Sequence, residues 1–185
     1  MKVNEFLKKV FALIEEYNPN EALQTDDTDL QAKAIEVVNQ VMYEMARIKK
    51  IPMYVEIKVT EGKVLKKTDI ENRLGYEVFQ IGEICGADCD SKADGTVYKF
   101  LEDGVAEITA YILPERISVE NMENYEFEVS SDVLEIMVYG VAADLLKSDQ
   151  SAAYGNVYAQ RYNDLKNTLD TRYQATSITI SGGGL

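Results

Sequence analysis

Apolar side chains recur every three or four residues in two stretches between Asp132 and Leu169, on either side of a polar break at residues 148–151. The first stretch carries two neighbouring rows: Val133, Met137, Val141, Leu145 and Leu134, Val138, Ala142, Leu146. The second carries Tyr154, Tyr158, Arg161, Tyr162, Leu165 and Leu169 along one side. The pattern predicts two helices that form an antiparallel hairpin, the first of them buried on more than one side.

The N-terminal part of the chain predicts two more helices, over residues 5–17 and 28–48, each with an apolar face. These helices and the C-terminal hairpin are expected to share one core. Asp132 and Glu135 have the spacing of a capping box, which predicts that they satisfy backbone N–H groups where the first hairpin helix begins.

Residues 52–113 change from a helical period to an alternating one, which is typical of β-strands. The expected strands are residues 54–60, 76–84, 96–101 and 105–113. Asp103-Gly104 separates the last two, and this dipeptide favours a tight hairpin turn. The sequence therefore predicts a small antiparallel β subdomain.

These elements together predict an α+β fold: a mainly α-helical bundle with an inserted small antiparallel β subdomain. The expected parts are N-terminal helices (1–50), a β insertion (51–117), a C-terminal helical hairpin (118–175) and a tail (176–185).

The hairpin resembles the C-terminal part of the head–tail connector, or portal adaptor, proteins of tailed bacteriophages. The similar segments are VYGVAADLL (138–146), SDQSAAY (148–154), VYAQRYNDLKNTL (157–169) and, before them, AEITAYILPERIS (106–118). The resemblance covers roughly residues 97–173 and is one of order and spacing. It implies a structural protein of the virion neck, made in the bacterial host cytoplasm. Such subunits form a ring under the portal, extend the DNA channel and hold the next neck or tail component.

The chain carries a net charge of −13 and no histidine, which argues against a basic face that grips DNA. In a connector, this charge would let DNA pass without specific binding and would oppose self-association before the portal is reached. An alternative from a different class is an acidic DNA mimic that inhibits a host DNA-binding enzyme. That interpretation requires carboxylates along one face at duplex phosphate spacing, whereas Asp26, Asp103 and Asp132 suggest positions in caps and turns.

Few residues point to chemistry, so no catalytic residue, metal site or cofactor is predicted. Cys85 and Cys89 form a single pair without histidine, which is too few ligands for an ordinary zinc site. Asp94-Gly95 favours a turn over a calcium loop. Without histidine the commonest general base is missing, and a metal-dependent hydrolase would need a buried cluster of three carboxylates in a cleft.

Tyr139, Tyr154, Tyr158 and Tyr162 lie on the predicted helices, either as packing residues or on a protein–protein surface; their spacing favours packing. The tail has strand character at Ser177, Ile178, Thr179 and Ile180, which are predicted to bind a partner by adding to a sheet edge. The alternative is a chain end without fixed structure. The sequence contains no run of about 18 apolar residues, so no membrane partner is expected.

Overall fold

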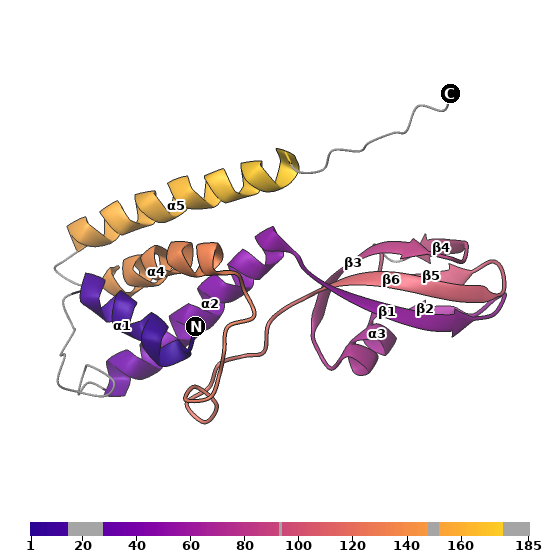
Figure 1. Cartoon of the computed structure of the whole chain (residues 1–185), viewed down its shortest axis with the longest axis horizontal. Coiled ribbons are helices and arrows are strands. Elements are labelled where there is room, and N and C mark those ends of the chain that lie inside the picture. Colours follow the sequence, from indigo (N-terminus) through magenta and orange to yellow (C-terminus); the bar gives the residue numbers. More distant parts are fainter. Residues whose placement is uncertain (15–27, 93, 148–151, 176–185) are drawn as a thin grey trace. The chain divides into compact units, whose positions relative to one another are not determined.

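A computed structural model describes residues 1–14, 28–92, 94–147 and 152–175 (Figure 1). The chain divides into two compact units. The helical unit comprises residues 1–49 and 117–185, and the sheet unit comprises residues 50–116. Each unit has its own core.

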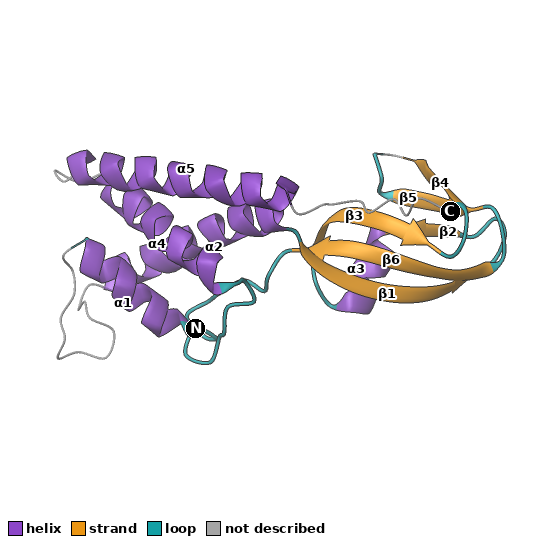
Figure 2. Ribbon diagram, turned by 45° about the horizontal axis from the view of Figure 1, so that its top comes forward, coloured by secondary structure: helices purple, strands orange, loops and turns teal. Residues whose placement is uncertain are grey.

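The helical unit is built around α4 (Ser131–Leu146), which packs against α1 (Val3–Leu13), α2 (Thr28–Lys49) and α5 (Ala152–Ala175) (Figure 2). Both apolar rows of α4 are buried, from Val133 to Leu146, because neighbours cover the helix on several sides. The prediction for this helix is therefore confirmed. α5 runs antiparallel to α4, since Gly155 lies against Leu146 and Tyr162 lies against Gly140.

The segment that leads from the sheet unit to α4 is held by a buried asparagine of α2. The Asn39 side chain donates a hydrogen bond to the Ile117 carbonyl (2.8 Å) and accepts one from the Ile117 N–H (2.9 Å). Asn39 is only 2% exposed, so these bonds satisfy polar groups that water does not reach. These two bonds hold both the Asn39 side-chain amide and the Ile117 backbone in place.

The sheet unit contains two three-stranded antiparallel sheets and helix α3 (Lys67–Leu74). The first sheet has the order β1-β6-β3: β1 (Ile51–Val59), β6 (Gly104–Ile112) and β3 (Val78–Cys85). The second has the order β2-β5-β4: β2 (Val64–Lys66), β5 (Val97–Phe100) and β4 (Cys89–Lys92). Their buried side chains form one core, which includes Ile70, Phe100 and Ile108.

The α+β class is confirmed, but the expected arrangement is wrong: the chain is not a mainly helical bundle with a small β insertion. Residues 50–116 form a second compact unit with two sheets, a helix and a hydrophobic core of their own. Alternation predicted β1, β3, β5 and β6 but not β2 and β4. β2 and β4 are short and mostly exposed, and α3 buries a single residue, Ile70, so neither a strand period nor an apolar helix face marks them.

The hairpin predicted at Asp103-Gly104 is also wrong, because β5 and β6 belong to different sheets. β6 pairs with β1 on one side and with β3 on the other. The Asp103 carboxylate instead accepts a hydrogen bond from the Glu61 N–H (2.7 Å), which ties together the two connections that follow β1 and β5. The turn expected at Asp94-Gly95 is present, and both residues have positive φ.

Candidate functional site

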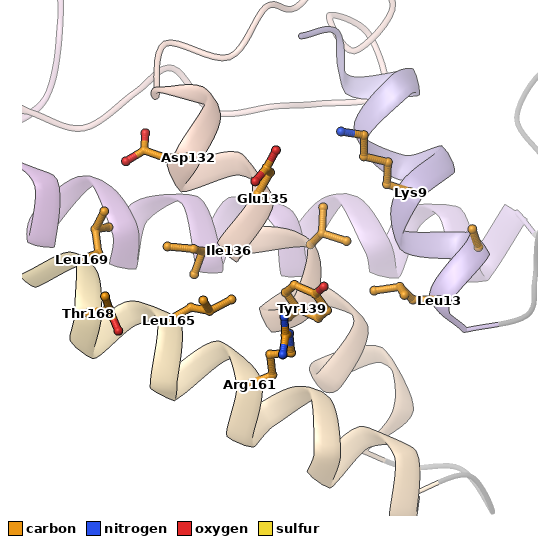
Figure 3. A pocket seen from close by; sticks show the side chains of 12 residues that line it. Lys9, Leu13, Asp132, Glu135, Ile136, Tyr139, Arg161, Leu165, Thr168 and Leu169 are labelled. Atoms are coloured by element: carbon orange, nitrogen blue, oxygen red, sulfur yellow. The ribbon is translucent and has the colours of Figure 1, made fainter.

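The helical unit carries a groove of about 560 Å³ between α1, α4 and α5 (Figure 3). Most of its lining is apolar: Ala12, Leu13, Ile136, Val138, Tyr139, Leu165 and Leu169. Polar and charged side chains complete it: Lys9, Asp132, Glu135, Arg161 and Thr168. A concave apolar floor with a charged rim is the usual form of a binding surface.

Small residues hold α4 and α5 close together next to the groove. A Cβ on Gly140 would lie only 2.9 Å from the Tyr162 ring, and a Cβ on Gly155 would lie 3.2 Å from the Leu146 Cβ. α4 and α5 can therefore approach each other closely at Gly140 and Gly155, where no Cβ separates them. At the groove, the larger side chains of Ile136 and Leu165 line the surface instead of a glycine.

Tyrosines fix the end of the groove beside α1. The Tyr158 hydroxyl donates a hydrogen bond to the Leu13 carbonyl (3.0 Å). The last carbonyls of a helix have no partner within the helix, so this bond also satisfies the C-terminal end of α1. The Tyr139 and Tyr158 rings lie 6.3 Å apart between centroids. Tyr139 and Tyr158 therefore take part in packing, as their spacing predicts, and Tyr139 also lines the groove. The packing prediction is wrong for Tyr154, which is 67% exposed.

The charged rim is partly engaged by neighbours within the helical unit. The Arg161 guanidinium lies 5.3 Å from the centre of the Tyr139 ring, in cation–π contact. Asp132 accepts a hydrogen bond from the Ser130 hydroxyl and forms an ion pair with Lys49 at 3.4 Å. The Ser130 hydrogen bond, followed by Lys49, lowers the pKa of Asp132 against the opposing effect of desolvation.

The expected capping box at Asp132 and Glu135 is wrong. α4 begins at Ser131, and its N-cap residue Ser130 makes no side-chain capping bond to the backbone. The Ser130 hydroxyl is directed to Asp132 instead. Glu135 is exposed and lies on the wall of the groove, where its carboxylate can meet a partner.

The described residues contain no group of three or more His, Cys, Asp or Glu placed to hold a metal ion. Cys85 and Cys89 are free thiols in the sheet unit. Desolvation and the Glu83 and Glu107 carboxylates raise the pKa of Cys85, and burial with Asp88 and Asp90 raises the pKa of Cys89. Because the thiolate is the reactive and metal-binding form, both cysteines are poorly suited to either role.

The partner-binding residues predicted in the tail, Ser177, Ile178, Thr179 and Ile180, lie outside the described residues. The groove was not predicted. Its wall residues Tyr139, Leu165 and Leu169 were recognised as positions on apolar helix faces, but sequence spacing does not tell which part of a face a neighbour leaves uncovered. Two features of the sequence indicate a surface that is not fully buried: Arg161 within the apolar row of α5, and the tyrosines, for which a protein–protein surface is the alternative to packing.

Comparison of the sequence with models of protein families finds no match, and a search among curated proteins finds no relative. Among the helices in the described part of the chain, none has both the length and the apolar character needed to cross a membrane. The features of the protein that bear on its function are therefore the groove, the charge and the sequence resemblance.

Proposed function

We propose that the protein is a structural subunit of a tailed-bacteriophage head–tail connector. In this role it forms a ring under the portal protein, extends the DNA channel and presents a platform to the next neck or tail component. The observation that carries the proposal is the open groove on α4 and α5, because these are the helices whose sequences resemble connector proteins. A subunit whose role is to hold neighbours needs such a binding surface and no catalytic residue or cofactor.

The positions of the acidic residues favour this proposal over an inhibitor that mimics DNA. Several carboxylates accept hydrogen bonds from backbone N–H groups within the fold. Asp69 accepts from Lys66 (2.9 Å), Glu71 from Val78 (3.1 Å) and Glu102 from Asp88 (3.0 Å). Carboxylates distributed over caps and connections in this way serve local structure, whereas a phosphate mimic needs them in a row along one face.

Electron microscopy of the full chain mixed with the portal protein of the same genome tests the proposal directly. Negative staining should show a ring added coaxially to the portal, and the portal alone provides the reference. Duplex DNA titrated with the protein at low salt should give no salt-sensitive complex. Portals that remain bare in the presence of excess protein would overturn the connector role.

A pair of variants on α5 tests whether the groove takes part in the ring. Leu165→Asp places a charge on the apolar wall of the groove, and we expect it to prevent ring formation, since a carboxylate loses its hydration in an apolar contact. Asn163→Asp adds the same charge at an exposed position that is not part of the groove, and should leave the ring unchanged. Circular dichroism establishes that both variants are folded.

A further inference from the structure

An exposed apolar stripe continues the groove along α5. Tyr154, Val157, Arg161, Leu165 and Thr168 follow one another at spacings of three, four, four and three residues, so they lie on one side of the helix. The last three line the groove. Tyr154 and Val157 protrude beyond it, with 67% and 60% of their surfaces exposed. One side of α5 thus carries an apolar ridge at one end and a groove at the other.

The spacing of this stripe is symmetrical about Arg161. Val157 and Leu165 are each four residues from Arg161, and Tyr154 and Thr168 are each seven residues from it. When a second copy of α5 is laid antiparallel with Arg161 at the centre, Val157 of each copy faces Leu165 of the other. Tyr154 of each copy likewise faces Thr168 at the far end of the other's groove. The ridge of each chain then matches the groove of the other at both ends.

We propose that two copies of this chain associate through α5 in this antiparallel, two-fold arrangement, with Tyr154 and Val157 of one copy seated in the groove of the other. The occupant of the groove is a second copy because the complementary ridge is present on the same helix at the matching spacing. Burial of the exposed ridge supplies the driving force, since removal of apolar surface from water dominates most protein association.

The charges around the groove suit such a pair. The two Arg161 side chains come near the two-fold axis, where each lies over Tyr139 of its own chain. Glu135, one helical turn before Tyr139, supplies a carboxylate beside them, and Lys9 adds a second cation to the rim. Because the rim carries both positive and negative charges, it can form ion pairs with the rim of a copy rotated about the two-fold axis. Such pairs offset locally the repulsion between two chains that each carry a net charge of −13.

A two-fold contact of this kind closes at two chains and cannot by itself build a ring, because rings require head-to-tail contacts. The dimer is therefore a form of the free protein in which the groove is already covered. This inference does not depend on the connector role, since it is tested without a portal. If the portal experiment fails, the dimer proposal is unaffected. If the free protein is monomeric, the proposed connector role is unaffected.

Sedimentation equilibrium of the full chain over a range of concentrations tests the inference. We expect a species of twice the 20.8 kDa chain mass. Val157→Glu should raise the dissociation constant at least about tenfold, since a charge in an apolar contact must lose its hydration. The matched control is Val119→Glu, at a valine of the helical unit that is 69% exposed and outside α5, and it should dimerise normally. A chain that stays monomeric throughout, or an equal effect of the two variants, would overturn the proposal.

Cross-linking tests the orientation. In a Cys85→Ser/Cys89→Ser background, Val157→Cys and Leu165→Cys are introduced into separate chains. A short thiol cross-linker should join the mixed pair. It should not join either variant to itself, because equivalent positions are then eight residues, or about 12 Å, apart along the helices. Cross-linking of each variant to itself indicates a parallel pair and contradicts the proposal, as does the absence of the mixed product.

Discussion

The helical unit and the sheet unit hold their shapes by different means. In the described part of the chain, every residue with positive φ lies in the sheet unit: Lys50, Gly62, Gly75, Gly86, Asp94 and Gly95. The chain of the sheet unit therefore changes direction between its short strands at backbone conformations that few residue types adopt. In the helical unit, whose described residues include none with positive φ, side chains connect the elements, as when Asn39 of α2 bonds both backbone groups of Ile117.

Glycine illustrates the difference. Gly86 in the sheet unit has φ +82°, and a Cβ there would lie 2.4 Å from the Val105 carbonyl oxygen. Gly140 in the helical unit lies in an ordinary helix, but a Cβ would press on the Tyr162 ring. The first glycine is required by backbone conformation and close backbone approach, and the second by helix packing. A unit held by side-chain packing can leave part of a helix face uncovered, as the groove shows.

The largest effect is expected at the buried link of the helical unit. Asn39→Ala leaves the Ile117 N–H and carbonyl without partners, and should lower the free energy of unfolding by roughly 2–6 kcal/mol, since each of the two groups costs about 1–3 kcal/mol. Hydrogen exchange should show lost protection in the helical unit and unchanged protection in β1 and β6. The exposed Asn163→Ala serves as control. Equal loss of protection in both units would contradict the division of the chain into two units with separate cores.

The corresponding change in the sheet unit is Gly86→Ala. We expect a loss of about 2–4 kcal/mol, because a left-handed conformation costs a residue with a Cβ about 1–2 kcal/mol and the new atom also collides with Val105. Gly62→Ala is a matched control: it has φ +79° but open space around its Cβ, so it should cost only about 1–2 kcal/mol. Urea unfolding measures both, and equal losses would show that the contact with Val105 is unimportant.

A smaller effect is expected for Gly140→Ala in α4. The new Cβ crowds Tyr162 and Val41, which destabilises the fold, but alanine favours the helix by about 1 kcal/mol over glycine. The net loss in the free energy of unfolding should therefore be about 1 kcal/mol. In Gly155→Ala the new Cβ meets the Leu146 Cβ at 3.2 Å and the Ala143 carbonyl oxygen at an ordinary 3.5 Å, so the change should be close to neutral. Adding Tyr162→Leu to Gly140→Ala relieves the contact, and a double-mutant cycle should show positive coupling. Additive effects would mean that the ring moves aside freely.

The helical unit could be predicted from sequence better than the sheet unit, for a physical reason. α4 is buried on several sides, so both of its apolar rows appear directly in the sequence. The strands β1 and β6 also alternate clearly, but their pairing depends on residues far apart in the chain. The Asp103-Gly104 dipeptide suggested a local hairpin, yet β6 pairs with β1 and β3.

The groove could not be predicted because it depends on what neighbours leave uncovered. Tyr154 and Tyr162 look alike in the row of α5, but Tyr162 is 8% exposed and Tyr154 is 67% exposed. Helical spacing places such residues on one side of a helix without stating how far along that side its neighbours reach. The symmetry of the stripe about Arg161 is visible in the sequence, but it gains meaning only once those exposures are known.

The smallest predicted effect concerns pH and again involves side chains between helices. Burial alone would raise the pKa of Glu44, but hydrogen bonds from Lys166 and Tyr162 (both 2.8 Å) outweigh it and lower the pKa below its ordinary value. A lowered carboxyl pKa stabilises the fold above about pH 4.5, the ordinary value, and this contribution is lost as the pH falls further. Glu44→Gln should remove that part of the acid sensitivity.

The size of this effect is expected to stay below about 1 kcal/mol, since the Glu44 side chain is 45% exposed and solvent screens its contacts. Urea unfolding at neutral pH and near pH 3 measures it for the wild type and for Glu44→Gln. Glu120→Gln removes the same charge from an exposed position of the helical unit outside the groove and should keep the wild-type pH dependence. If both variants flatten the pH profile equally, the cause is net charge, and the contact between α2 and α5 through Glu44 contributes nothing specific.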